Sequence, residues 1–498
     1  MENKLSRKYG LFTAICMVVG IVIGSGVFFK AQTILQRTGG DMITGIIAWI
    51  IGGAIMLVCL LTFAFMGQKY EKVNGLVDYA EATMGKSYGY YMGWFATTIY
   101  YPGMTSALAW LSARYTLVFL EKTGFPLLTI VTGAKEIIVR ENETGGEILD
   151  YIEVSLLDGP IGGPECLALA ACYLCVIYAI NALAPKLAGK FQTTTTVIKL
   201  IPLALMAVVG LIVGIVSGVL PQNMTTVPTP EELNDLKVVV SASPLLAGVS
   251  ATAFAYEGWI IATSINSEIK DSKKNLPKAL ILGGIIIIAV YLLYFIGVAG
   301  GADTKTLIGT GASAAFINVF GNIFGNVLNL FVAISCLGTL NGLMVGATRG
   351  MYTLSARNDG PAPKVFGTVD KHTNMATNSA VIGLVVTAIW LLYFFLSNLA
   401  GTWGGIFAFD STELPIITIY AMYLPMFVAW MVKEKDQSVL RRFIMPILAC
   451  GGSVFMVYSC VAAHGWKCVG YLIVFAVIML IGALLRKVGH KKLETEEE

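Results

Sequence analysis

The feature that most constrains the fold is a series of apolar runs, each about 20 residues long, that recur along the whole chain. A helix of that length crosses the hydrocarbon core of a bilayer. The composition agrees, because 56% of the 498 residues are hydrophobic and only 13% are charged. We therefore predict an all-α, polytopic membrane protein. Its twelve expected transmembrane helices cover residues 9–33, 41–67, 87–120, 165–184, 190–219, 242–266, 277–300, 315–348, 377–398, 405–431, 441–463 and 467–487.

The basic residues indicate how these helices are oriented. An even number of spans places both termini on one side, and most of the 34 lysine and arginine residues fall in the termini and loops of that side. Cytoplasmic loops are enriched in these residues. The first apolar run, Leu11 to Phe29, has no small-residue cleavage site before it and is expected to remain as a span. We therefore expect a multi-pass protein of the plasma membrane with both termini in the cytoplasm.

The spans group into a small number of sections. An acidic extracellular insertion at 121–164, with alternating apolar residues typical of a small hairpin, separates the third span from the fourth. Its role is open between a solvated insertion and a gating or partner-binding element. The expected sections are an N-terminus at 1–8, a first half at 9–219, a second half at 242–431, a final helix pair at 441–487 and a tail at 488–498.

Two spans contain residues that do not suit a continuous helix. The first contains GIVIGSGVFF (Gly20 to Phe29), although Gly costs about 1 kcal/mol relative to Ala inside a helix. The sixth contains ATAFAYEGWIIATSINSE, with Glu257 and Gly258 near its middle. Paired interruptions at corresponding positions of two halves indicate a transporter with inverted repeats. The alternative for the first span is close helix packing, because Gly20 and Gly24 have the spacing of a GxxxG pair.

Broken helices would give such a chain a binding site. Backbone released from a helix inside a bilayer must line a polar cavity or be covered by protein. A break at Gly24–Gly26 gives the outer half-helix a free N-terminus, whose N–H groups suit a carboxylate. Carbonyl groups near Ile21 to Ile23 and near Phe254 to Glu257 would suit a cation. Donors beside acceptors match the carboxylate and ammonium groups of an α-amino acid.

Three stretches of the sequence resemble a known superfamily. They are VVGIVIGSGVFF, FAYEGWIIATSINSEIKDSKKNLPKAL and CLGTLNGLMVGATRGMYTLSARNDGPAPKVFG. They resemble the amino acid–polyamine–organocation superfamily, and they look closest to its L-type amino acid transporter branch and bacterial relatives. The resemblance extends from about Leu11 to Met431. It implies a five-plus-five inverted repeat of the leucine-transporter type with two added C-terminal helices.

The resemblance also implies roles for individual residues. Backbone N–H groups at Gly24, Ser25 and Gly26 would hold the substrate carboxylate. Carbonyl groups of Val22, Phe254 and Glu257 would accept hydrogen bonds from its ammonium group. The substrate-binding residues implied in this way are Val22, Ile23, Gly24, Ser25, Gly26, Phe254, Ala255, Glu257, Gly258, Ser335 and Asn341.

The resemblance also implies roles for four side chains. Phe254 would gate the outer side of the site, and Ser335 and Asn341 would lie near the side-chain pocket. Lys199 matches a fifth-span lysine that in many family members replaces a sodium site and tethers the broken first helix. The alternative for Lys199 is a side chain that extends to the membrane surface.

The acidic residues leave several roles open. Glu257 departs from the family pattern, and it could favour cationic side chains, take up a proton or pair with a buried donor. Asp410 and Glu413 in FDSTELPIITIY are expected near water at the outer end of the tenth span, and a gate role for them is open.

The most direct interpretation is a secondary amino-acid transporter that works by alternating access, as an exchanger or a proton-coupled symporter, without sodium. The alternatives are a polyamine or organic-cation transporter and an amino-acid-sensing membrane receptor. The sequence contains no nucleophile–base pair or phosphate loop, so we do not expect an enzyme. We expect no cofactor and no metal. The expected partners are an amino acid and the lipid bilayer, but no nucleic acid, for a monomer or homodimer. Eukaryotic relatives join a heavy chain through a cysteine near the position of Cys166, but no such partner is expected for a bacterial protein.

Overall fold

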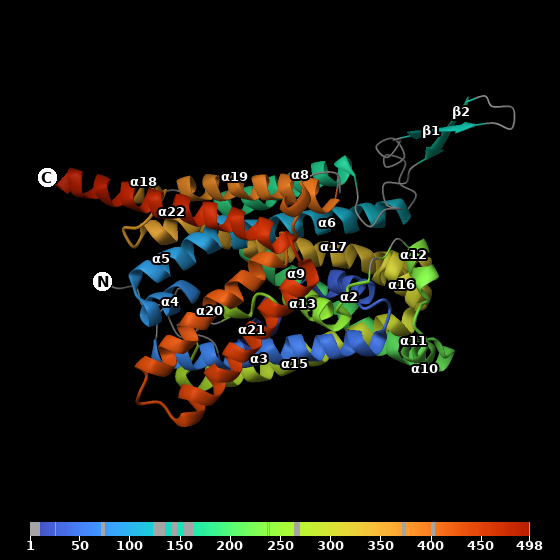
Figure 1. Cartoon of the computed structure of the whole chain (residues 1–498), viewed down its shortest axis with the longest axis horizontal. Coiled ribbons are helices and arrows are strands. Elements are labelled where there is room, and N and C mark those ends of the chain that lie inside the picture. Colours follow the sequence, from blue (N-terminus) through green and yellow to red (C-terminus); the bar gives the residue numbers. More distant parts are fainter. Residues whose placement is uncertain are drawn as a thin grey trace.

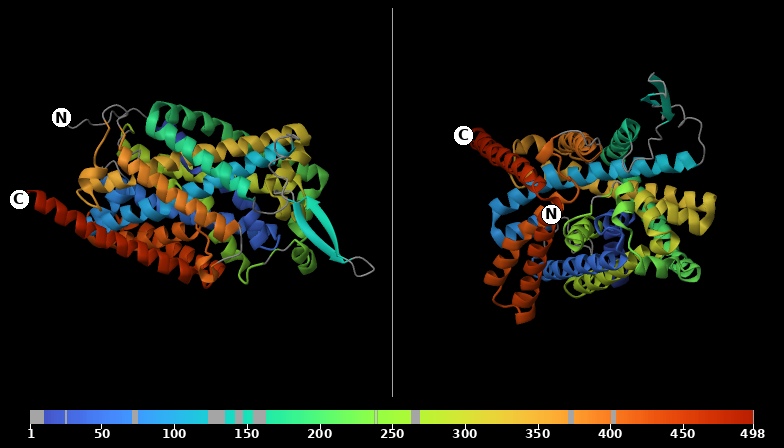
Figure 2. Two further views of the ribbon diagram at one scale, coloured as in Figure 1. Left: turned by 90° about the horizontal axis from the view of Figure 1, so that it is seen from above. Right: turned by 45° about the vertical axis from the view of Figure 1, so that its right-hand side comes forward.

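The computed structural model describes residues 10–24, 26–70, 75–122, 135–141, 147–153, 163–236, 238, 240–262, 269–370, 375–399 and 404–497. In this part of the chain every regular element is helical except one β-hairpin (Figure 1). Most helices run along the long axis of the molecule. The hairpin lies at one end of this axis and both chain termini lie toward the other (Figures 1 and 2). We call these ends the hairpin face and the terminal face.

Each of the twelve predicted ranges contains helix. In chain order the helical segments are α1 (Leu11–Val22) and α2 (Gly26–Arg37), α3 (Met42–Lys69), α5 (Lys86–Phe95) with η1 (Ala96–Tyr100) and α6 (Tyr101–Lys122), α8 (Pro164–Leu183), α9 (Pro185–Leu205) with η2 (Met206–Gly210) and α10 (Leu211–Ser217), α13 (Pro244–Tyr256) and α14 (Trp259–Ala262), α15 (Ser272–Gly301), α17 (Ala312–Ser355), α19 (Thr377–Phe394) with η4 (Phe395–Leu399), α20 (Leu414–Lys433), η6 (Leu440–Ile444) with α21 (Met445–His464), and α22 (Lys467–Glu497). Shorter helices between them are α4 (Leu76–Met84), α11 (Val219–Thr225), α12 (Pro230–Asp235), α16 (Thr304–Thr310), α18 (Pro363–Phe366) and the 3₁₀ turn η5 (Gly405–Phe407).

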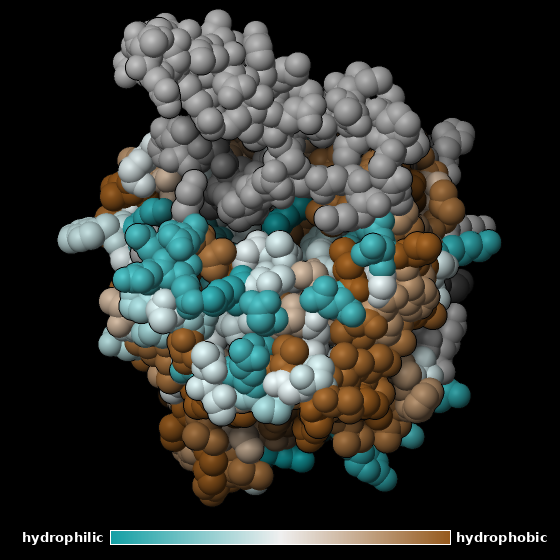
Figure 3. All heavy atoms as spheres, turned by 90° about the vertical axis from the view of Figure 1, so that its right-hand side faces the viewer, coloured by the Kyte–Doolittle hydropathy of each residue, from teal (hydrophilic) through white to brown (hydrophobic). Residues whose placement is uncertain are grey.

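The helices have the length and composition of membrane spans. Within the described residues, nine helices are long and apolar enough to cross a bilayer, and shorter apolar helices lie at Leu11–Gly20 and Pro244–Tyr256. Figure 3 looks onto the hairpin face, where hydrophilic residues gather near the centre and hydrophobic ones toward the rim. The polytopic helical fold is therefore confirmed. The number of twelve crossings and the division into two inverted halves stay predictions.

One predicted boundary was wrong. The tenth span was expected from residue 405, but α20 begins at Leu414. The Asp410 carboxylate accepts hydrogen bonds from the backbone N–H groups of Thr412 and Glu413, so a turn held by this side chain precedes the helix. The last helix continues to Glu497, so the range expected as the cytoplasmic tail is helical up to that residue, and its place outside the membrane stays a prediction.

The insertion at 121–164 contains the expected hairpin. Strand β1 (Lys135–Glu141) pairs with β2 (Glu147–Glu153) in antiparallel register, with Ile138 opposite Asp150. The hairpin extends away from the helices in each view of Figures 1 and 2. Its role stays open.

Backbone-to-backbone helix packing occurs where η2 and α10 cross α15. A Cβ atom on Gly214 would lie 2.2 Å from the Cα atom of Gly300, and one on Gly297 would lie 2.0 Å from the carbonyl oxygen of Met206. Small residues allow such close approach between helices in a membrane. This crossing therefore requires glycine on both helices.

We predict that Gly300→Leu destabilises the protein, because its Cβ atom would lie 2.3 Å from the carbonyl oxygen of Gly210. Overpacking of this kind costs about 1–3 kcal/mol. The measurement is the Tm of the detergent-purified protein. Gly451→Leu is the matched control, because a Cβ atom there meets no atom within 4 Å. Equal Tm values for the two variants would contradict the prediction.

Candidate functional site

The first helix break lies between α1 and α2. Helix α1 ends at Val22, Ile23 has extended backbone angles, and α2 begins at Gly26. Ser25 lies outside the described residues. A Cβ atom on Gly26 would lie 2.7 Å from the Cα atom of Ala255, so glycine lets the start of α2 contact the sixth span. The glycines therefore serve both a break and a close approach, whereas the alternative from sequence was packing alone.

The second break lies between α13 and α14. Helix α13 ends at Tyr256, Glu257 is extended, and Gly258 has φ +100° before α14 begins at Trp259. Residues with a side chain rarely adopt this left-handed region, so glycine is needed at 258. Because Gly26 contacts Ala255, the two breaks lie side by side.

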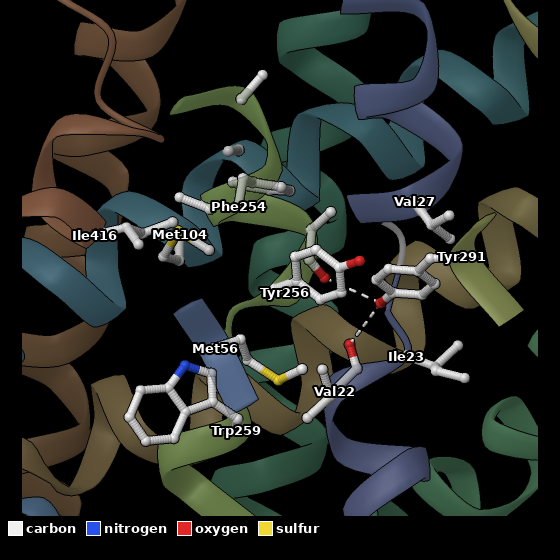
Figure 4. Close-up of a cluster of buried hydrophobic side chains, with 14 of the residues drawn as sticks. Val22, Ile23, Val27, Met56, Met104, Phe254, Tyr256, Trp259, Tyr291 and Ile416 are labelled. Carbon is white, nitrogen blue, oxygen red and sulfur yellow. Dashed lines mark hydrogen bonds between the residues drawn. The ribbon is translucent and has the colours of Figure 1, made fainter. Parts of the chain in front are cut away.

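Tyr291 on α15 links the two breaks. Its hydroxyl oxygen lies 2.9 Å from the carbonyl oxygen of Ala255 and 3.1 Å from that of Val22 (Figure 4). A hydroxyl group has one hydrogen to donate, so it serves one carbonyl group at a time. Both carbonyls belong to interrupted helices and need such a donor in a bilayer. Nothing in the sequence near Tyr291 pointed to this role.

A cavity of about 240 Å³ lies at the breaks. Eight of its lining residues were expected from the sequence: Val22, Gly24, Gly26, Lys199, Phe254, Ala255, Glu257 and Gly258. The sequence interpretation did not assign the other eight to the site: Gly20, Tyr100, Met104, Leu108, Gln192, Thr339, Gly342 and Leu343. Half of the cavity lining thus comes from the two broken helices, and the other half from η1, α6, α9 and α17.

Three expected residues do not line this cavity. Ile23 and Ser335 are fully buried away from it. The side chain of Asn341 is 2% exposed and forms hydrogen bonds to Asn181 and Gln192 instead. Apolar residues lie on all sides of this part of α17, so the sequence pattern does not indicate which side faces the cavity. In the structure, Thr339, Gly342 and Leu343 face it.

Glu257 offers a carboxylate oxygen to the cavity. Its side chain is buried, and Oε1 accepts a hydrogen bond from the Tyr100 hydroxyl. Oε2 has no hydrogen-bond partner among the described residues. A buried polar atom without a partner is costly. This oxygen therefore favours a ligand or a proton that can satisfy it.

Lys199 contacts the broken first helix directly. Its Nζ atom donates a hydrogen bond of 2.6 Å to the carbonyl oxygen of Gly20, less than one turn before α1 ends. The residue is 3% exposed, and it lies about 20 Å along the helix from the start of α9 at Pro185. The side chain is therefore directed at the helix break and not at the membrane surface.

Aromatic and charged groups pack together beside Phe254, which lines the cavity. The ring of Phe254 packs edge-on against Phe29, with ring centroids 6.4 Å apart. The Lys30 ammonium lies 5.1 Å from the centroid of each ring. This favourable cation–π arrangement places a buried charge directly over the gate residue expected from the sequence.

Lys30 belongs to a buried ion cluster around Glu413. Lys30 Nζ lies 2.5 Å from Glu413 Oε1, and Arg37 Nη1 lies 2.7 Å from Oε2. Ser250 Oγ and His464 Nε2 each lie 3.1 Å from Oε2. The expectation that Glu413 lies near water was wrong, because its side chain is 0% exposed. The sequence could not reveal this, since the partners come from α2, α13 and α21.

The ligand atoms of this cluster lie close enough together to hold a metal ion, but cationic side chains already contact them. Asp410, Glu413 and His464 offer ligand atoms within 4.8 Å of one another. Both oxygens of Glu413 already contact the cationic groups of Lys30 and Arg37. Positive charges at this distance oppose a metal cation. We therefore interpret the cluster as an ion-pair network.

Comparisons with known proteins place the chain among transport proteins. A family model described as amino acid permease matches residues 9–484. The serine/threonine exchanger SteT of Bacillus subtilis is 27% identical over 477 residues, which cover 94% of each chain. The human large neutral amino acids transporter small subunit 2 is 26% identical over 370 residues, 73% of this chain and 60% of that protein. The aspartate-proton symporter of Bacillus subtilis is 22% identical over 492 residues, 96% of this chain and 84% of that protein.

We predict that Tyr291→Phe lowers the Tm of the purified protein, because the carbonyl groups of Val22 and Ala255 lose their shared donor. A buried acceptor left without a partner costs about 1–3 kcal/mol. Tyr458→Phe is the control, because the Tyr458 side chain is 61% exposed. The prediction fails if both variants unfold at the same temperature.

Proposed function

The chain belongs to the amino acid permease family, and from that premise we propose that it is a secondary active transporter that moves an α-amino acid across the cell membrane. The relatives named above are exchangers, transporters and a symporter, which agrees with the expectation that the chain is not an enzyme. The observation that carries the proposal is the meeting of two helix breaks at one cavity. Such a cavity offers main-chain donors and acceptors to one small molecule.

The two breaks supply complementary groups for the substrate. Gly24 and Gly26 line the cavity at the start of α2, where N–H groups and the positive end of the helix dipole favour a carboxylate. The carbonyl groups of Val22, Phe254 and Glu257 accept from the ammonium group. A carbonyl oxygen has two lone pairs, so the hydrogen bond from Tyr291 leaves Val22 able to accept another.

Lys199 replaces a sodium ion in this proposal. Its contact with Gly20 supports a tether on α1, and its burial in α9 does not favour the alternative of a surface-seeking side chain. A fixed ammonium group beside the break supplies the positive charge that a bound sodium ion would otherwise provide. Transport is therefore independent of sodium. Exchange and proton coupling both remain compatible with this arrangement.

Alternating access follows from the two sides of the cavity. On the hairpin side, Phe254 and the Glu413 cluster form the closed gate. Toward the terminal face, a second cavity of about 280 Å³ extends from Tyr101 to Arg349 and Thr353 near the end of α17. Tyr101 directly follows Tyr100, which lines the first cavity. We interpret this second cavity as the exit path, and the structure as a state closed on the hairpin side.

The membrane arrangement completes the proposal. Both termini lie in the cytoplasm, so the terminal face is the inner one, and residues 9–219 and 242–431 form the two inverted halves. The protein acts without a heavy chain. Cys166 supports this, because it is fully buried and its Sγ atom lies 3.8 Å from the carbonyl oxygen of Trp110.

We predict that the purified protein in liposomes preloaded with amino acids takes up a radiolabelled amino acid equally well in sodium and choline buffers. Lys199→Met reduces this uptake at least tenfold, because the first helix loses its tether. Lys435→Met, at an exposed position, is the control. Empty liposomes with a pH gradient distinguish proton coupling from exchange. Uptake that collapses without sodium, or full activity of Lys199→Met, would contradict the role of Lys199.

We propose that Glu257 Oε2 binds a cationic group of the substrate side chain. Glu257→Gln is then expected to weaken the uptake of lysine and arginine about tenfold or more relative to leucine, because a hydrogen bond to a charged group contributes about 1.5–3 kcal/mol. Tyr100→Phe is the control, since it leaves both carboxylate oxygens in place. If lysine and arginine are taken up undiminished by Glu257→Gln, Glu257 has another role.

A polyamine or other organic cation is the second candidate substrate. The unpartnered oxygen of Glu257 favours it, whereas the N–H groups at the start of α2 would have no anion to bind. Competition between spermidine and the radiolabelled amino acid in the same liposomes separates the two candidates.

A further inference from the structure

Three amide side chains form a hydrogen-bonded relay that ends at the cavity. Asn181 Nδ2 on α8 donates to Asn341 Oδ1 on α17 at 2.8 Å, and Asn341 Nδ2 donates to Gln192 Oε1 on α9 at 3.0 Å. Asn181 and Asn341 are 3% and 2% exposed. Gln192 lines the cavity, whereas the other two do not. The relay thus connects the interior of the helix bundle to one wall of the binding site.

Backbone contacts fix the orientation of each amide in the relay. Asn181 Nδ2 also donates to the carbonyl oxygen of Ile177 at 2.9 Å, and Asn341 Nδ2 to that of Ala188 at 3.2 Å. Carbonyl oxygens only accept hydrogen bonds, so neither asparagine can be turned over without losing one. Asn341 therefore donates an N–H group to Gln192, and Gln192 accepts this hydrogen bond with Oε1. Its Nε2 group is left without a protein acceptor among the described residues.

The amide of Gln192 lies beside Gly342 on α17. A Cβ atom on Gly342 would lie 3.6 Å from both Nε2 and Oε1 of Gln192, in ordinary van der Waals contact with the amide. Gly342 lines the cavity one helical turn from Thr339, which contacts Gly24 at the first break. Three residues of helix correspond to about 4.5 Å. Gln192 and Gly24 at the first break therefore line the same cavity, each beside a residue of this one turn of α17.

We propose that Gln192 is a specificity-determining residue whose Nε2 group donates a hydrogen bond to an oxygen atom on the substrate side chain. Asn341 and Asn181 are positioning residues that hold the amide in this orientation. The inference rests on the proposed function and narrows its substrate class. Among uncharged amino acids it favours those with a side-chain hydroxyl or amide oxygen over aliphatic ones of the same shape, and it makes no claim on the cationic substrates proposed for Glu257.

The discrimination has a simple physical origin. An aliphatic side chain that fills the same space covers the Gln192 donor without accepting its hydrogen bond. A site that binds a hydroxyl group through a buried donor rejects the analogue that lacks it, because the donor is then left unsatisfied. Threonine and valine have nearly the same shape and differ in this one group. Their relative uptake therefore isolates the effect.

The experiment measures threonine and valine exchange by the full chain in liposomes. Gln192→Met removes the donor, and the ratio of threonine to valine kcat/KM is expected to fall about fivefold, the effect of one neutral hydrogen bond. Asn341→Asp leaves the cavity wall unchanged but presents only acceptors, so Gln192 turns its N–H group toward Asp and its oxygen toward the cavity. The threonine hydroxyl can donate to that oxygen, so the threonine-to-valine ratio is kept, whereas O-methylthreonine, whose ether oxygen only accepts, loses uptake relative to threonine. Thr193→Met, at an exposed position of α9, is the control.

The outcomes are distinguishable from a failure of the proposed function. If Gln192→Met exchanges valine and keeps the wild-type ratio of threonine to valine, or if Asn341→Asp keeps the wild-type ratio of O-methylthreonine to threonine, the inference is wrong. For a variant that does not transport, the Tm shifts caused by the same pair of amino acids give the binding ratio, and an unchanged ratio overturns the inference in the same way. A wild-type protein that neither exchanges nor binds any amino acid would refute the proposed function itself.

Discussion

The whole site depends on one constraint, that main-chain polar groups freed inside a bilayer must find partners within the protein. Two helices stop and restart at neighbouring points, and each leaves carbonyl groups that no helical turn can satisfy. Tyr291 serves Val22 and Ala255, and Lys199 serves Gly20. These side chains come from α15 and α9. Their hydrogen bonds therefore fix the positions of the two breaks relative to the surrounding helices. What the surrounding helices leave unsatisfied is what a ligand can use.

Local patterns were sufficient to predict the helices and their interruptions. Apolar runs of bilayer length marked the spans, and glycine or an acid at mid-span marked both breaks. The start of α20 was missed because the turn before it is held by the Asp410 side chain, which a hydropathy pattern does not register. The burial of Glu413 was missed because its cationic partners Lys30 and Arg37 are 383 and 376 residues away in sequence.

The walls of the cavity were harder to predict than its ends. In a helix that is apolar all round, periodicity does not indicate which face turns inward. Family resemblance selected Asn341 on α17, yet its amide faces α8 and α9, while Thr339 and Gly342 face the cavity. Gln192 gave no local signal at all. Its importance comes from neighbours on two other helices, and only coordinates bring these together.

The contact between His464 and Glu413 has a consequence for the last two helices. They lie outside the two halves predicted from the sequence, so a ten-helix core would be the natural candidate for a minimal working unit. His464 nevertheless reaches into the buried ion cluster from the end of α21. A shortened chain that stops after α20 would expose this charged centre to lipid or water from one side. The last two helices are therefore needed to cover the ion cluster, and we do not expect them to be dispensable.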